Sequence, residues 1–335
     1  PPSVSLLYLH NQQSFAAKEA EISLNLAIKS RLQREIDQQL RSSVPLIQQH
    51  ALQQQALFLS GLIRSTIWEY KLQYVLIKQA EQKLTILTKL LNHYEQFSKA
   101  GNSPAYLTLL VKQETMQSRI ALLEHKNQAQ ALLANYYALT GIVDLPEDIN
   151  ETDKHLSLVT VNQHPDIQAL DASWQLYTAQ MQESSHQSQP WNVSVNAKQI
   201  ETTGIKENQI GLGLEVPLSM GNKHTQSQYS AFTVAQSQYY LERDKLVQQI
   251  QQSISSAKAQ LELSNQRQSL LDQALALTLQ LQPTLETLLT SNTADQEWIL
   301  RRSLEIVDIQ AQFATNQVNL QKNMATLNQA VGKSL

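Results

Sequence analysis

The densest group of residues that could do chemistry lies near the C-terminus. Arg301, Arg302, Glu305 and Asp308 occupy about two helical turns, so Arg301 and Glu305 can form an ion pair while Asp308 lies on the neighbouring face. If copies of the chain surround a common axis, each inward residue becomes a ring of charges that can hold a passage shut or filter ions. An ordinary solvated helix face, on which ion pairs contribute little, explains the same residues.

The other reactive residue types do not form a recognisable site. The chain has eight histidines, none of them paired at helical metal-binding spacing, and it has no cysteine. We find no glycine-rich phosphate loop, no nucleophile elbow and no acid/base pair. The sequence therefore predicts a protein that is not an enzyme and that holds no metal ion or cofactor.

Composition indicates long helices rather than a compact interior. Only 6% of the 335 residues are aromatic and only eight are glycine, while Gln, Leu and Ala dominate. The formal charge of −3, without a Lys/Arg run, argues against nucleic acid as a partner. No stretch reaches the ~18 consecutive apolar residues of a membrane-spanning helix. No signal peptide precedes Pro1, and the chain opens abruptly on PPSVSLLYLH, so we expect that its natural beginning lies upstream.

The second half of the chain repeats the first. EISLNLAI at 21–28 corresponds to GLGLEVPL at 211–218, and LTG at 139–141 corresponds to AVG at 330–332. The same offset carries Gly101 to Asn292, and both residues lie in the clearest break of a helical stretch. The repeat unit is strand, strand, very long helix, tight turn and second helix.

Apolar residues at three- and four-residue steps predict long helices over 31–98 and 222–290. At ~1.5 Å per residue each is a rod of about 100 Å. Between the repeats, the acidic segment 142–164 predicts a surface segment, and a helix follows from Pro165 to about Ser188. One turn apart on the first helix, Arg64 and Trp68 are placed to stack as a cation on a ring.

Each long helix ends in a sharp reversal. Gly101 can adopt the left-handed conformation that ends a helix, Ser103 can cap the next helix, and Pro104 suits its first position. In the second repeat Asn292 replaces the glycine and Thr293 can begin a capping box. Good turn and cap chemistry explains these residues without any further function.

Two strand pairs, 3–10 with 20–28 and 191–201 with 209–218, precede the long helices. Each strand is close to the ~9–11 residues that a tilted transmembrane strand requires. The second strand is two-faced, with Ile22, Leu24, Leu26 and Ile28 on one side and Glu21, Ser23 and Asn25 on the other.

Four strands cannot close a barrel alone. A bilayer does not tolerate bare sheet edges, and closed barrels start at about eight strands, so several chains must contribute to one barrel. From the alternation alone, two ordinary hairpins packed on a soluble helical domain remain an equal alternative. The repetition of the strand pairs favours the membrane interpretation, with Tyr8 and Trp191 as candidates for an interfacial aromatic girdle.

Over nearly its whole length the chain resembles the TolC family of outer membrane efflux proteins, the outer membrane factors. The resemblance is carried by NQHPDIQAL at 162–170, IGLGLEVPLSMGNKH at 210–224, ALTG at 138–141, LNQAVG at 327–332 and the two-fold repeat. IRSTIWEY at 63–70, together with LNQAVG, is most similar to the CzcC-like branch associated with heavy-metal export.

The resemblance implies a mainly α fold with a small β part. Long helical hairpins would form an α-barrel tunnel, and four transmembrane strands per chain would join a shared trimeric β-barrel. It divides the chain into β-hairpin 1 (1–30), helical hairpin 1 (31–141), an equatorial segment and helix (142–189), β-hairpin 2 (190–220) and helical hairpin 2 (221–335). Pro217 and Gly221 would mark the corner from strand to helix.

The same resemblance implies a passive exit duct. A homotrimer in the outer membrane of a Gram-negative cell would extend through the periplasm and work with a periplasmic adaptor protein and an inner-membrane pump. The adaptor would dock on the turns, at Gly101, Asn102, Ser103, Pro104, Asn292, Thr293, Ala294 and Asp295. Arg301, Arg302, Glu305 and Asp308 would include the periplasmic gate.

Two other classes of protein use long helical hairpins. A periplasmic coiled-coil adaptor of the membrane fusion type would flank one hairpin with barrel-like segments, and a structural coiled-coil scaffold leaves the strand alternation unexplained. The sequence does not distinguish metal ions, drugs or peptides as the exported substrate.

Overall fold

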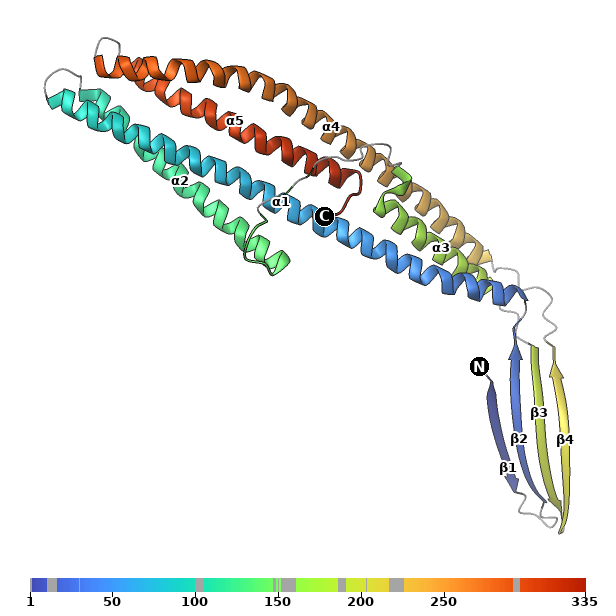
Figure 1. The fold of residues 1–335 in the computed structure, drawn as a ribbon. Coiled ribbons are helices and arrows are strands. Elements are labelled where there is room, and N and C mark those ends of the chain that lie inside the picture. The colour runs from blue at the N-terminus through green and yellow to red at the C-terminus, as the bar shows by residue number, and fades with distance from the viewer. Residues whose placement is uncertain are drawn as a thin grey trace. The chain divides into compact units, whose positions relative to one another are not determined.

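Long helices and short strands follow one another in two similar series (Figure 1). The computed structural model describes residues 2–10, 17–29, 31–99, 105–146, 149, 151, 161–185, 191–202, 204–216, 226–291 and 296–335. The first series is β1 (Ser3–His10), β2 (Ala17–Ile28), α1 (Arg31–Lys99) and α2 (Ala105–Thr140). After η1 (Val161–Gln163) and α3 (Pro165–Ser185), the second series is β3 (Trp191–Thr202), β4 (Ile205–Glu215), α4 (Gln226–Ser291) and α5 (Gln296–Ala330).

The predicted turn and corner residues lie outside this description. It leaves out Gly101–Pro104, Asn292–Asp295, Pro217 and Gly221. Their roles stay predictions. The helices that flank both turns are described, and they end and begin within a few residues of the predicted positions.

The four strands form one antiparallel sheet in the order β1-β2-β3-β4. Leu6 pairs with Ile22, Ile22 with Ala197, and Ala197 with Ile210, so residues of the same kind align across all four strands. Because direction alternates at every step, β1 and β4 run in opposite directions. In the part of the chain that the structure describes, each of these two strands has one unpaired edge.

The chain divides into two compact units. One contains the sheet, with residues 1–51 and 168–244, and the other contains residues 52–167 and 245–335. The five segments predicted from the sequence are functional divisions and stay a prediction.

In the second unit the helices form a layer in the order α2, α1, α5, α4 (Figure 1). Gln79 of α1 donates to the Asp308 carboxylate of α5 at 3.1 Å. Asn316 of α5 donates to the Ser264 backbone oxygen of α4 at 3.0 Å. The two hairpins therefore pack mainly through α1 and α5, α2 also contacts α5 near the turns, and α2 and α4 lie at the two sides of the layer.

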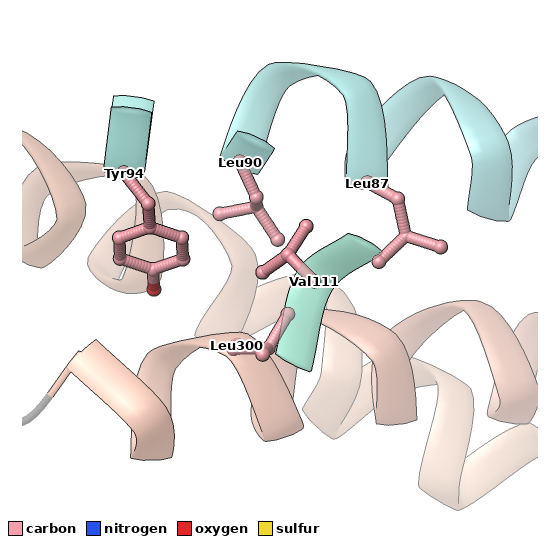
Figure 2. Close-up of a cluster of buried hydrophobic side chains, with 5 residues drawn as sticks. All are labelled: Leu87, Leu90, Tyr94, Val111 and Leu300. Carbon is pink, nitrogen blue, oxygen red and sulfur yellow. The ribbon is translucent and has the colours of Figure 1, made fainter. Parts of the chain in front are cut away.

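A small apolar core joins the hairpins near the turns. Leu87, Leu90 and Tyr94 of α1 follow one another at three- and four-residue steps, so they share one helix face. Figure 2 shows them with Val111 of α2 and Leu300 of α5, and all five side chains are almost fully buried. Burial of this face holds α1, α2 and α5 together.

Both repeats end in a glycine with a left-handed backbone. Gly141 has φ 70° and donates to the Tyr137 oxygen at 2.8 Å, which closes α2 with an αL cap. Gly332 has φ 85°, and hydrogen bonds from Gly332 to Gln329 and from Lys333 to Asn328 close α5 with a Schellman motif. The predicted correspondence of these two glycines extends to their conformation.

Candidate functional site

One face of the sheet is apolar and exposed. Ile210 and Leu212 are 84% and 83% exposed, although their side chains stand beside other apolar residues across the ladder. The face consists of Val4, Leu6, Tyr8, Ile22, Leu24, Leu26, Ile28, Trp191, Val193, Val195, Ile210, Leu212 and Leu214. A contiguous apolar surface of this size marks an interaction with a membrane or another protein.

The opposite face is mainly polar and internally bonded. The Ser5 and Ser23 hydroxyls lie 2.6 Å apart, and the Lys198 ammonium lies 2.8 Å from the Glu19 carboxylate. Leu7 and Leu9 of β1, Ile200 of β3 and Ile205 of β4 are apolar exceptions on this side. The sheet therefore has one apolar face and one mainly polar face, as the alternation in the sequence predicts.

Two glycines of β4 make room for polar side chains on this face. A Cβ atom at Gly211 would lie 2.3 Å from the Asn196 Oδ1, and one at Gly213 would lie 2.3 Å from the Ser194 Oγ. Any larger residue at these positions would displace its β3 partner. The sequence GLGLE thus places leucines on one face, and its glycines leave the other face to the Asn196 and Ser194 side chains of β3.

The exposed aromatic residues stand at opposite ends of the apolar face. Tyr8 lies across from Ala20, and Trp191 lies across from Ile28. From Ala20 to Ile28 of β2 there are eight residue steps, which span about 26 Å at ~3.3 Å per step. Among the described helices, none holds an apolar stretch long enough to cross a membrane.

The four charged residues of α5 do not form one cluster. Arg301 pairs with Glu297 at 2.6 Å, Arg302 pairs with Glu305, and Asp308 accepts from Gln79 of α1. The predicted pair of Arg301 with Glu305 is therefore wrong. Glu297 competes better because an acid four residues before a base is the favoured arrangement on a helix.

A buried ion pair that the sequence did not reveal lies in the second unit. The Arg64 Nε is 2.8 Å from the Glu151 Oε1, and their side chains are only 7% and 4% exposed. Asn328 of α5 donates to the Glu151 Oε2 at 2.8 Å. Arg64 also donates to the Lys333 backbone oxygen at 2.6 Å, so the end of α5 is fastened to the middle of α1.

This network corrects two predictions. Arg64 does not stack on Trp68; instead Lys71 lies 5.1 Å from the centre of that ring. The segment 142–164 is not exposed throughout, because Glu151 is buried. Arg64 and Glu151 can both be buried because each satisfies hydrogen bonds of the other. Stacking on Trp68 would leave most of the five guanidinium donors of Arg64 without an acceptor.

In the first unit, Asp171 fastens α3 to α4. It accepts from Arg243 at 3.0 Å and from the Tyr239 hydroxyl at 2.7 Å, and the Trp174 ring stacks on Tyr239 at 4.8 Å. Burial, together with the hydrogen bond to Asp171, raises the pKa of Tyr239 to about 12. These contacts explain the aromatic residues of α3 by packing.

No group of three or more His, Asp and Glu residues in the described ranges is arranged to hold a metal ion.

No protein-family model matches the chain, and no curated protein sequence matches it. Solved structures do. A structure of CusC, a transmembrane channel, superposes with a TM-score of 0.73 at 12% identity, over 100% of this chain and 83% of CusC. The outer membrane protein VceC from Vibrio cholerae gives 0.71 at 14% identity, over 100% of this chain and 86% of VceC. The open state of the Neisseria gonorrhoeae outer membrane channel MtrE gives 0.63 at 11% identity, over 99% of this chain and 81% of MtrE.

These likenesses confirm the predicted fold class at the level of one chain, mainly helical with a small four-stranded sheet. The chain has the fold of solved bacterial outer membrane channel proteins.

Proposed function

We propose that this chain is one subunit of an outer membrane factor of the TolC family, a passive duct through the outer membrane and periplasm of a Gram-negative cell. The observation that carries the proposal is the two-faced sheet with an unpaired edge on β1 and on β4. An apolar face that no described helix covers suits lipid, and a polar face suits a water-filled lumen.

The strand order supports closure with sister copies. Since β4 runs opposite to β1, β1 of the next copy can extend the sheet beside β4 without breaking the antiparallel pattern. Three copies give twelve strands, an even number above the ~8 needed for a closed membrane barrel. Two strand pairs, each followed by a long hairpin, fit this role better than the single hairpin of a periplasmic adaptor.

The aromatic residues support the placement in the membrane. Tyr8 and Trp191 stand at the two ends of the apolar face, where headgroups would meet the hydrocarbon. Their separation along the strand is close to the apolar band of ~25 Å of known membrane barrels. The polar face then lines the passage, and no step of catalysis is involved.

The turns at Gly101–Pro104 and Asn292–Asp295 form the periplasmic tip in this proposal. There a periplasmic adaptor docks and recruits the inner-membrane pump that supplies the energy for export. The resemblance of IRSTIWEY to the CzcC-like branch makes heavy-metal ions one candidate cargo, beside drugs and peptides, and the sequence does not choose among them. Comparing export with a metal-type and a drug-type pump would make that choice.

We place the periplasmic gate among Arg301, Arg302, Glu305 and Asp308. The Gln79–Asp308 hydrogen bond joins the two hairpins twenty residues before the end of α1 and twelve residues after the start of α5, so its loss favours a wider opening. In a planar bilayer, Asp308→Ala and Arg301→Ala channels should conduct more than the parent. Lys258→Ala, which removes an exposed charge of α4 further from the turn, is the control. If the parent and all three variants conduct equally, these residues do not form the gate.

The proposed function is tested by adding the purified full-length chain to a planar lipid bilayer. We expect stepwise conductance, lost in Leu212→Arg because a cation on the lipid face costs about 2–4 kcal/mol near the bilayer centre. Gln209→Arg, on the polar face of the same strand, should still insert. A parent protein that stays folded in aqueous buffer and never conducts refutes the proposal.

A further inference from the structure

The apolar face of the sheet ends in a row of charged side chains, here called the basic row. Each strand contributes one residue to it, and the register aligns them in the order His10, Lys18, Glu201 and Lys206. These side chains are on the same face as Tyr8, because His10 follows it by two residues. The basic row therefore lies about 7 Å beyond the tyrosine, at ~3.3 Å per residue.

The basic row has more positive than negative charge. The Lys206 ammonium lies 4.0 Å from the Glu201 carboxylate, and the Lys206 side chain is 62% exposed. Lys18 is also exposed, and no carboxylate of a described residue forms an ion pair with it. Glu201 can neutralise one lysine only, so one cation is left for a ligand.

An apolar groove of about 580 Å³ lies beside the basic row. Ala20 and Ala197 are diagonal neighbours on β2 and β3, and their short side chains leave the space. The side chains that border it on this face include Leu6, Tyr8, Ile22 and Ile210. A groove lined in this way suits the hydrocarbon part of a ligand.

Amide groups stand between the groove and the basic row. Gln199 and Asn208 line the groove at the level of Tyr8, and the Gln199 Nε2 donates to the Asn208 Oδ1 at 3.0 Å. This bond uses one of the four amide N–H groups of the two residues, so the others can donate to a ligand. Apolar groove, amide donors and ammonium groups thus follow one another along the face.

We propose that this surface binds a lipid whose headgroup carries an anionic phosphate. An acyl chain occupies the groove over Ala20 and Ala197, and the phosphate oxygens accept from the ammonium groups of Lys18 and Lys206. Lysines just outside an apolar band can extend their ammonium groups to the headgroup level. The proposal rests on the proposed function, because the apolar face meets lipid only there, and it names the class of lipid that the sheet selects.

Lipid titration followed by native mass spectrometry tests the site. This 335-residue chain, in detergent, is titrated with phosphatidylglycerol or with phosphatidylcholine of the same acyl chains, whose headgroup has no net charge. We expect tighter binding of phosphatidylglycerol. Lys18→Gln combined with Lys206→Gln should lower the apparent affinity for phosphatidylglycerol about twentyfold, because each cation near an anionic lipid surface contributes a factor of about five.

Two further variants separate charge from groove. Lys245→Gln combined with Lys258→Gln makes the same change in charge at exposed positions of α4, and it should leave the affinity for phosphatidylglycerol unchanged. Ala20→Leu combined with Ala197→Leu fills the groove and keeps both lysines, so both lipids should bind more weakly. Inorganic phosphate in excess should not displace phosphatidylglycerol, because it cannot occupy the groove.

Conductance in a planar bilayer is measured on the same protein preparations. A chain that conducts but binds phosphatidylglycerol equally well with and without Lys18 and Lys206 overturns the lipid site and leaves the duct standing. Displacement of the lipid by inorganic phosphate has the same consequence. A parent chain that never conducts overturns the duct and, with it, the lipid site.

Discussion

The two helical hairpins share a topology but differ in what fills them. In hairpin 1, α1 packs on α2 through large apolar side chains, such as Leu87, Tyr94 and Val111. In hairpin 2, the buried face of α4 alternates in character along its seven-residue repeat: Ile250, Ala257, Ser264, Leu271, Thr278 and Leu285. A buried Asn316 of α5 bonds to α4 at the serine layer. Hairpin 2 therefore has a fully buried polar layer between its helices, which fixes register, whereas the polar contacts between α1 and α2, such as His125 with Gln73 at 2.9 Å, are only partly buried.

The ends of the hairpins differ as well. Among the described residues, none has an atom within 4 Å of the position that a Cβ of Gly141 would take, whereas a Cβ at Gly332 would lie 2.6 Å from the Pro165 Cδ. The end of hairpin 2 is also fastened by Arg64 and Glu151. Hairpin 1 thus has an open end, at which Gly141 contacts no described side chain, whereas hairpin 2 has an anchored end, held by packing on Pro165 and by the pair of Arg64 with Glu151.

The largest effect should come from breaking that anchor. Arg64→Ala leaves the Glu151 carboxylate buried without its partner, which we expect to cost about 3–5 kcal/mol of unfolding free energy. Lys126→Ala, which removes the exposed pair with Glu81 in hairpin 1, should cost about 0–1 kcal/mol. Denaturant unfolding of the full chain measures both, and equal costs would contradict the difference between the two ends.

A smaller effect should separate the two interiors. Leu87→Ala removes a fully buried side chain from hairpin 1 and should cost about 2–5 kcal/mol. Asn316→Ala in hairpin 2 removes two hydrogen bonds, at about 0.5–1.5 kcal/mol each. Denaturant unfolding of the two variants shows which substitution costs more unfolding free energy. A costlier Asn316→Ala would mean that polar layers, rather than apolar volume, dominate.

The terminal glycines allow a matched comparison. Gly141→Ala introduces only a side chain with left-handed φ, at about 1–2 kcal/mol. Gly332→Ala adds the contact with Pro165, and overpacking of this kind costs a further ~1–3 kcal/mol. We expect a lower melting temperature for Gly332→Ala, and indistinguishable variants would argue against the anchored end.

The smallest effect concerns pH. The Asp166 backbone N–H donates to the His164 Nδ1 at 3.2 Å, which caps α3 only while that nitrogen is unprotonated. Burial lowers the pKa of His164, against the opposing charge of Asp166. Because the unfolded chain then binds the proton at a higher pH, stability should fall as the pH drops below about 6.5. Melting curves between pH 7.5 and 5.5 should show this decline, and His164→Asn, which keeps a capping oxygen, should reduce it.

Much of the fold follows from local patterns in the sequence. The alternation in GLGLE and the three- and four-residue steps of the helices are set within a few neighbouring residues, so the elements and their order could be predicted. Arg64 and Glu151 lie 87 positions apart in the sequence, so no local pattern predicts that they pair. Arg301 has one acid four residues before it, Glu297, and one four residues after it, Glu305. Their equal spacing did not decide which of them pairs with Arg301. The turn residues Gly101–Pro104 stay predictions.

The number of copies is the most direct test of the central claim, that this sheet is completed only by sister chains. Native mass spectrometry of this 335-residue chain, released from detergent, should give three times its mass of 37.8 kDa. A stable, folded species at the mass of a single chain, in the absence of detergent, would contradict the account.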